Sequence, residues 1–280
     1  MTAYVGDTIP YARRGAAMGW VMSGMAFGQI VGIPAGTLLA GSTGFQTPFM
    51  VFGGVMVAAW VLTMTVLPAV PSQSSIPLGV RSALVGYVDL LRRRDIAAAS
   101  AASVIMMLGV SLYIVYYPAW LEAKLGASPG SIAVMFLLGG LSNAVAGPFA
   151  GRLSDRIGRR RLVVGSSLAL APLMGVTPFI PTFTWIYPLF FLVMGVVGFR
   201  MGPLTALLTA LVEGDRRGSL MSLSMATGQV GFAIGAAVAG WAYVQLGYSS
   251  NALGAALGAV ITAALIAGWV AEPTGLERPV

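Results

Sequence analysis

Long apolar runs separated by short polar segments dominate this chain. Stretches of about 20 residues, free of charge apart from Arg200, occur at 17–40, 46–67, 97–120, 131–150, 163–181, 185–211, 218–245 and 250–271. Each is long enough for an α-helix to cross the hydrocarbon core of a bilayer. A membrane-spanning helix also pairs all of its own backbone polar groups. The pattern therefore predicts an all-α membrane protein with eight transmembrane helices.

The composition agrees with this pattern and narrows the chemistry. The chain is 57% hydrophobic and 9% charged, whereas a typical soluble domain is about 25% charged. It contains no cysteine and no histidine, which excludes disulfides, thiolate nucleophiles, the usual zinc sites and Ser-His or Cys-His catalysis. We therefore expect no catalytic residues, no metal, no cofactor and no enzymatic activity.

The basic residues predict an orientation in the membrane. Fourteen of the sixteen lie before the first span, in 68–96, 151–162 and 212–217, or in the C-terminal tail, and the other two are Lys124 and Arg200. By the positive-inside rule, these segments and both termini face the cytoplasm. The net charge of +7 is then a topology signal beside anionic lipids rather than a nucleic-acid site. We expect a multi-pass protein of a prokaryotic inner (plasma) membrane, whose partners include the lipid bilayer and no nucleic acid.

The longest connection predicts a domain boundary. It opens with Pro68, Pro71 and Pro77 among serines, a composition typical of a linker. A stretch follows in which Leu84, Val85, Val88 and Leu91 share one helical face, as in a helix lying on a membrane surface. We divide the chain into residues 1–80, which hold the first two spans and the start of the linker, the amphipathic linker 81–95, and the six-helix segment 96–280.

An internal repeat predicts that part of a larger architecture is missing. At an offset of 203 residues, Arg14-Gly15 aligns with Arg217-Gly218, and Met18, Gly28, Gly32, Gly44 and Phe45 align with Met221, Gly231, Gly235, Gly247 and Tyr248. Repeated helix sets of like orientation are typical of secondary transporters. The second half starts near residue 97, so its counterpart would start about 106 residues before Met1, which leaves room for four spans at about 20 residues each.

One segment carries a family resemblance. Residues 151–161 read Gly-Arg-Leu-Ser-Asp-Arg-Ile-Gly-Arg-Arg-Arg, which is similar to the signature loop Gly-x-Leu-x-Asp-Arg-x-Gly-Arg-Arg of the major facilitator superfamily. In that family the loop lies between spans two and three and often recurs between spans eight and nine. The resemblance implies a major facilitator fold that lacks the first four of its twelve helices. Residues 1–80 would hold family helices five and six, and residues 96–280 helices seven to twelve.

The first span resembles one branch of that family. Asp7, Arg13-Arg14-Gly15 and then Gly28, Gly32, Pro34 and Gly36 resemble the loop and glycine-rich fifth helix of drug and sugar efflux antiporters. Ile33, Thr37 and Gln46 depart from the branch's common pattern. These glycines and Gly231 and Gly235 have two interpretations, a gating role at the interface between halves or plain close packing of helices.

The signature segment also has two interpretations. The family implies a latch that holds the cytoplasmic side closed and breaks as the halves rock, formed by Gly151, Asp155, Arg156, Gly158, Arg159 and Arg160. Asp155 could cap the positive N-terminal end of a neighbouring helix or pair with an arginine. Ordinary positive-inside topology would explain the arginines, but neither Asp155 nor the glycines.

Arg200 is the one charge inside a predicted span, where a cation costs roughly 2.5–3.5 kcal/mol on insertion scales. It is either a site for an anionic substrate group or coupling carboxylate, or a structural partner of Asp155 or of backbone carbonyls. Helices that line family cavities add further candidates: Gln29, Tyr113, Tyr116, Tyr117, Asn143 and Gln229.

Together these patterns predict a secondary transporter that exports small organic compounds, drug-like or sugar-like, by alternating access. No acidic residue lies inside a predicted span, so any proton-coupling carboxylate is expected in the missing helices. We expect a small-molecule substrate and a monomer when the protein is full length. The alternative is a truncated, non-transporting membrane protein or scaffold fragment of such a transporter.

Overall fold

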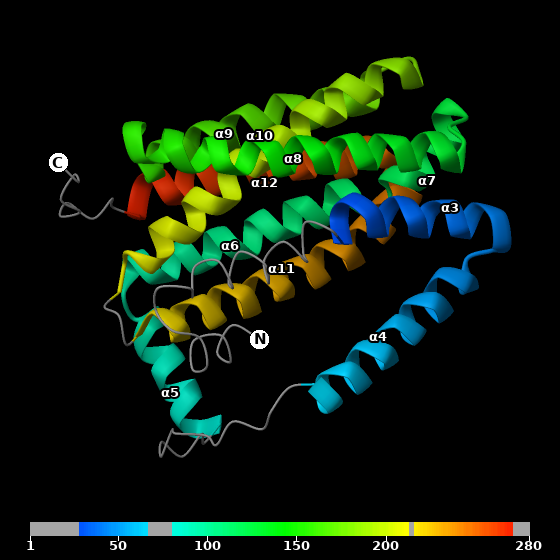
Figure 1. The fold of residues 1–280 in the computed structure, drawn as a ribbon. Helices are drawn as coiled ribbons and strands as arrows, with labels where there is room; N and C mark the ends of the chain where they lie inside the picture. The colour runs from blue at the N-terminus through cyan, green and yellow to red at the C-terminus, as the bar shows by residue number, and fades with distance from the viewer. Residues whose placement is uncertain (1–27, 67–79, 213–215, 271–280) are drawn as a thin grey trace. The chain divides into compact units, whose positions relative to one another are not determined.

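The structure, a computed structural model, describes residues 28–66, 80–212 and 216–270. Within these ranges seven helices are long and apolar enough to cross a membrane (Figure 1). They coincide with the last seven predicted spans. The first half of the first predicted span, 17–40, falls outside the described residues, and its second half forms a π-helical turn, η1 (Gly28–Gly32), and most of α3 (Ile33–Thr43).

The chain divides into two compact units, which we describe separately. Unit 1 comprises the described residues of Met1–Pro77 together with Ser128–Gly140, and unit 2 comprises those of Leu78–Ala127 and Leu141–Val280. After α3 come α4 (Gln46–Val66), α5 (Val80–Leu91), α6 (Arg94–Ile114), α7 (Tyr117–Leu125), α8 (Pro129–Ile157), α9 (Arg159–Val176), η2 (Thr177–Phe179), α10 (Phe183–Thr209), α11 (Arg217–Leu246) and α12 (Tyr248–Trp269).

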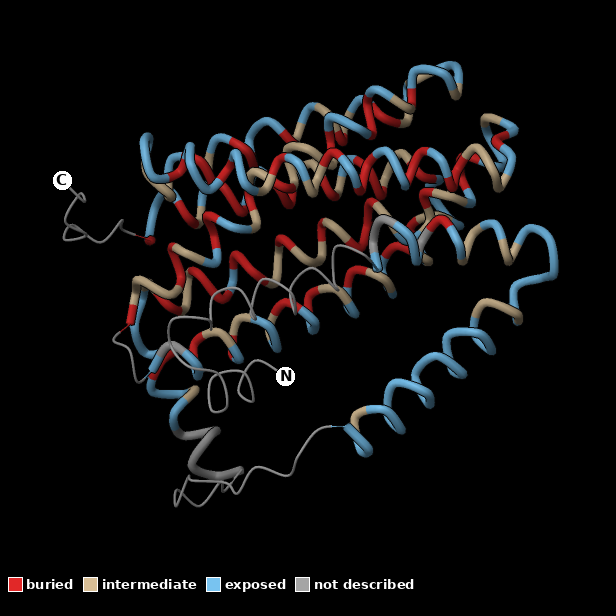
Figure 2. The backbone as a smooth tube through the Cα atoms, viewed as in Figure 1, coloured by how far each residue is buried: buried red, intermediate tan, exposed pale blue. Residues whose placement is uncertain are grey.

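Unit 2 is held together by helices that approach closely at small residues. α6 packs against both α11 and α12, and α9 packs against α10 and α12. A Cβ added at Gly231 of α11 would lie 2.2 Å from the Val104 carbonyl oxygen of α6. A Cβ added at Gly235 would lie 2.6 Å from the Leu108 carbonyl oxygen, also on α6. Only glycine allows this approach, so the close-packing interpretation is confirmed for these two glycines. The buried residues follow these contact faces (Figure 2).

The repeat predicted from the sequence recurs in local structure. Gly44, between α3 and α4, and Gly247, between α11 and α12, both have positive φ, at 94° and 75°. Each donates its N–H to the carbonyl four residues earlier, Ala40 or Tyr243, and each accepts a hydrogen bond from the amide three residues later. When the bounds of α4 are shifted by 203 residues, they fall within one residue of those of α12. The two helix pairs thus have the same connection.

Two boundaries differ from the sequence prediction. The predicted span 97–120 is broken into α6 and α7 at Val115 and Tyr116, because Pro118 favours the first turn of a new helix over the interior of an old one. The sequence predicts a loop at 151–162, and this prediction is wrong. α8 continues to Ile157 and α9 begins at Arg159, since only Gly158, with φ of 97°, leaves the helical conformation.

Candidate functional site

The signature residues lie at one end of unit 2, which we call the Gly158 end; it comprises the α8–α9 and α10–α11 connections and the start of α6. Gly151, Asp155 and Arg156 occupy the last two turns of α8 and are exposed. Asp155 Oδ1 lies 3.9 Å from Arg159 Nη2, and its side chain is 70% exposed. A pair this long and this solvated contributes little stability. The carboxylate therefore remains accessible to a further partner.

Arg159 and Arg160 bind the ends of other helices. Arg159 Nη1 donates to the Ala206 carbonyl in the last turn of α10, at 3.3 Å. Arg160 Nε donates to the Ile266 carbonyl near the end of α12, at 3.3 Å, and its Nη2 donates to Ala267. The last carbonyls of a helix lack intrahelical partners and carry partial negative charge, so a guanidinium is favourable there. These two arginines tie the start of α9 to α10 and α12.

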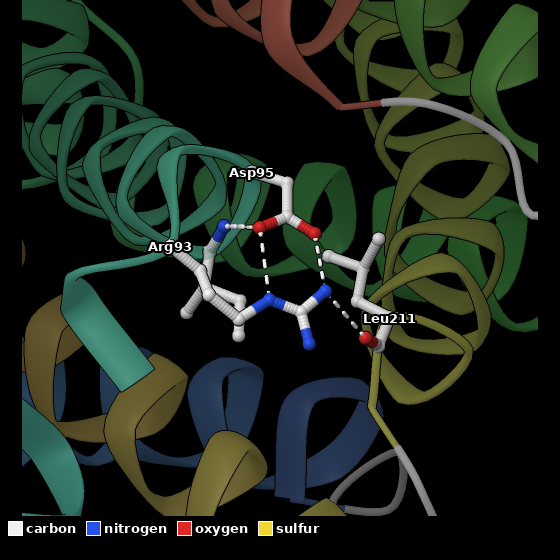
Figure 3. A network of polar contacts seen from close by, with 4 residues as sticks. Arg93, Asp95 and Leu211 are labelled. Carbon is white, nitrogen blue, oxygen red and sulfur yellow. Dashed lines mark hydrogen bonds and ion pairs between the residues drawn. The ribbon is translucent and has the colours of Figure 1, made fainter. Parts of the chain in front are cut away.

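A third arginine, Arg93, lies directly before α6 and also binds the end of another helix (Figure 3). Arg93 donates to both carboxylate oxygens of Asp95, at 3.2 and 2.7 Å, and to the Leu211 carbonyl just beyond α10, at 3.0 Å. Asp95 in turn accepts the Ile96 N–H in the first turn of α6, where a negative charge is favourable. The hydrogen bonds to Asp95 raise the pKa of the Arg93 guanidinium above its usual value. The sequence analysis missed this network, although Asp95 directly before an apolar run is a helix-start signal.

The linker helix α5 also contacts the Gly158 end of unit 2. Asp89 accepts a hydrogen bond from Arg216 at 2.9 Å, and Leu90 is buried in a cluster with Ile96, Val212, Leu220 and Leu223. On the expected amphipathic face, Val88 and Leu91 remain exposed, as a lipid-facing surface requires. α5 therefore contacts the Gly158 end through an ion pair and an apolar cluster.

Arg200 lies inside unit 2. It is 2% exposed, and its Nε and Nη2 have no hydrogen-bond partner among the described residues. It borders a cavity of about 10 Å³ together with residues of α6, α9 and α12, which is room for one water-sized particle. Among the described residues, Asp155 lies beside Arg159 rather than Arg200, and Arg200 Nε and Nη2 donate to no backbone carbonyl. Its role in binding an organic substrate stays a prediction.

Tyr113 and Tyr117 belong to an aromatic cluster at the opposite end of unit 2, the α7 end. The cluster also contains Trp120, Phe190 and Tyr248, with ring centroids 4.7 to 6.2 Å apart. The Tyr248 hydroxyl donates to the Tyr113 carbonyl at 2.8 Å, and the hydroxyls of Tyr113 and Thr177 are 3.0 Å apart. The sequence analysis missed Trp120, although the spacing of Tyr113, Tyr117 and Trp120 would place them on one face of an unbroken helix. These tyrosines join α6, α7, η2 and α12 in the structure.

The α7 end also has an open hollow. It measures about 510 Å³ and is lined by Trp120, Lys124, Pro178, Tyr243, Val244, Gly247, Tyr248 and Ser249. Its volume falls in the range of small-molecule pockets, about 300–1,000 Å³, whereas the cavity beside Arg200 does not. The sequence candidate Tyr116 lies next to it, stacked on Tyr243 with ring centroids 5.0 Å apart.

The remaining candidates are scattered. Gln229 is exposed on α11, and Asn143 is partly buried on α8, where its backbone lies against Gly198 of α10. The side chain of Gln29 is outside the described residues. Pro34 is buried, but a Cβ added at Gly28, Gly32 or Gly36 would have no described atom within 4 Å. The described residues of the predicted antiporter-like helix therefore show no close helix packing at these glycines.

Comparison with known proteins identifies relatives along the whole chain. The model of the Major Facilitator Superfamily matches residues 1–118 and 99–279. An uncharacterized MFS-type transporter of Bacillus subtilis, YceJ, is 26% identical over 227 residues, which is 81% of this chain and 57% of the relative. An MFS-type efflux pump of Mycolicibacterium smegmatis is 26% identical over 96% of this chain and 66% of its own length. The human chromaffin granule amine transporter is 26% identical over 84% of this chain and 44% of its own. This chain thus spans about half to two thirds of each of these relatives.

Proposed function

Because the chain belongs to the major facilitator superfamily, a family of membrane transporters and not of enzymes, we propose that it works in a secondary active transporter that exports small organic compounds. It is a multi-pass integral membrane protein. Transport would proceed by alternating access, with two related helix sets rocking about a central site. The name of one relative, an MFS-type efflux pump, supports export over import.

The observation that carries this proposal is the repeated helix pair. The α3–α4 and α11–α12 connections share their positive-φ glycines and their hydrogen bonds at a single offset. Such repeats relate the two halves of transporters of this kind. The exposed Asp155 beside the Gly158 turn, next to arginines anchored on α10 and α12, supports a latch at the Gly158 end. The anchored arginines would hold α9 in place while Asp155 makes and breaks its contact.

The same repeat supports the proposal that four helices precede α3 in the complete transporter. α12 packs against α6 and α9, whereas its counterpart α4 has no buried residue. At the 203-residue offset, the equivalents of α6 and α9 would lie before Met1. Gly28 and Gly32 correspond to Gly231 and Gly235, whose packing partner is α6. The packing partner of Gly28 and Gly32 would therefore also lie before Met1. Restoring those helices would cover an apolar surface that includes Phe49, Phe52 and Trp60.

Several finer features are proposed on the same basis. Residues 1–80, 81–95 and 96–280 would be the end of the first bundle, the linker and the second bundle. The antiporter branch is supported by Gly28, Gly32, Pro34 and Gly36, and proton coupling would use a carboxylate from the preceding helices. Both termini of this chain would face the cytoplasm of a prokaryotic cell, and the complete transporter would be a monomer with a small-molecule substrate.

The test is an efflux assay in bacteria with a panel of fluorescent cationic and neutral dyes. The chain is expressed alone and extended by the codons that precede Met1 in its gene. We expect efflux from the extended form, and we expect Asp155→Asn to lower it at least severalfold without lowering membrane insertion, because an amide holds no charge for the latch. The control is Glu122→Gln, a matched loss of charge at the α7 end.

Equal efflux by Asp155→Asn and wild type would remove Asp155 from the gating role. An absence of efflux by both forms, with normal insertion, would favour the alternative of a non-transporting fragment or scaffold. Efflux by the chain alone would show that the preceding helices are not required.

A further inference from the structure

Arg200 is buried, and no acidic residue of the described ranges pairs with its charge. Its side chain is 2% exposed, and it lies about 26 Å from the start of α10 and about 14 Å from its end. The described ranges contain four acidic residues, Asp89, Asp95, Glu122 and Asp155, all near helix ends. Three of these form ion pairs with arginines other than Arg200, and Glu122 is exposed on α7. No protein carboxylate of the described ranges therefore balances the guanidinium.

The cavity beside Arg200 is lined by residues without a charged or strongly hydrogen-bonding side chain. They are Met106, Gly109, Val110, Met174, Ala255 and Ala259. These residues are apolar, and the carbonyls of their helices already accept intrahelical hydrogen bonds. Gly109 of α6 faces Ala255 of α12, since a Cβ added at Gly109 would lie 3.4 Å from the Ala255 carbonyl oxygen. Nε and Nη2 are the unpaired donors of the guanidinium, and a cavity adjoins it.

We propose that this cavity is a binding site for a single monatomic anion of the size of chloride, held by the Arg200 guanidinium between α6, α9, α10 and α12. The volume of about 10 Å³ is close to that of one water-sized particle, so a single monatomic ion fits it better than a polyatomic anion does. Water alone could accept hydrogen bonds from Nε and Nη2 but would leave the charge uncompensated, and a buried charge is costly unless it is paired. A halide meets both requirements.

The experiment measures thermal unfolding of the complete purified chain in detergent at constant ionic strength and pH. Sodium chloride and bromide are compared with sodium gluconate and sulfate. We expect chloride and bromide to raise Tm saturably, by about 3–5 °C for an ion that binds only the folded state, and gluconate and sulfate to have no such effect. Arg200→Met, which keeps a long side chain but removes the charge, should abolish the halide effect. The matched control Arg92→Met changes an exposed arginine of the same chain and should preserve it.

Other results would overturn the proposal. If Tm is the same in all four salts, or is highest in sulfate as in a general salting effect, no halide site exists and water alone solvates Arg200. A halide effect that persists in Arg200→Met would place the anion elsewhere. If Arg200→Met does not fold, Arg200→Lys replaces it. A point charge with a different donor geometry should weaken the saturation by halide, and an unchanged midpoint would contradict the assignment to Arg200. None of these readouts depends on transport.

Discussion

Single residues at the helix crossings decide how closely unit 2 packs. Gly231 and Gly235 allow the backbone of α11 to touch the carbonyls of α6, and a methyl group at either position would force the helices apart. Gly165 of α9 is different, because a Cβ there would have no described atom within 4 Å. Glycines that are alike in the sequence thus have different roles. The difference is visible only in what lies opposite each of them.

At this scale we predict that Gly231→Ala destabilises the folded chain. The new Cβ would lie 2.2 Å from the Val104 carbonyl oxygen, and overpacking of this kind typically costs about 1–3 kcal/mol. Thermal unfolding in detergent should show a lower Tm. Gly165→Ala serves as the control and should keep or raise Tm, since alanine is the better helix former. Equal Tm values for the two variants would contradict the close contact between α11 and α6.

The arginines of the Gly158 end act on whole helices. Arg93, Arg159 and Arg160 each donate to a carbonyl at or near the end of α10 or α12. Arg159 and Arg160 thus have a structural role in addition to any role in orientation or gating. Asp155 and Arg156 remain exposed, and the latch stays a prediction.

For these elements we predict that Arg160→Gln loosens the end of α12. The variant loses a charged donor to Ile266 and Ala267, an interaction with a helix end that contributes about 0.3–2 kcal/mol. Hydrogen exchange followed by mass spectrometry should show faster exchange near residues 266–270. Arg161→Gln, at the exposed neighbouring position, should leave this exchange unchanged. Equally slow exchange in wild type and Arg160→Gln would mean that the capping contributes nothing.

At the scale of the whole molecule, the main question is how the spanning helices are oriented in the membrane. The arginines concentrate at the Gly158 end, while Lys124 and the aromatic cluster lie at the α7 end. Helices that cross the bilayer place these two ends on opposite sides of it. The positive-inside rule predicts which side is which.

This orientation can be tested with single cysteines, since the natural chain has none. Glu122→Cys and Arg161→Cys introduce one thiol at exposed positions of the α7 and Gly158 ends. In intact bacteria a membrane-impermeant maleimide should label Glu122→Cys, and it should label Arg161→Cys only after the cells are permeabilised. The cysteine-free wild type controls for background labelling. The opposite pattern would reverse the predicted orientation.

The sequence alone determined the helical membrane fold, the family and the repeat. These features are linear: a span is an apolar run as long as the bilayer is thick, and the signature and the glycine register are read from neighbouring residues. The last seven spans are accordingly close to their predicted bounds. The family model covers residues 1–118 and 99–279.

Only the tertiary structure decided what each polar side chain touches. Arg160 meets a carbonyl 106 residues away, and the Tyr248 hydroxyl meets one 135 residues away, so neither contact leaves a pattern within a sequence window. The same holds for Arg200, which borders a small cavity lined by residues of α6, α9 and α12. Hydrophobic pattern places a residue in a helix, but its environment depends on which other helices pack around it.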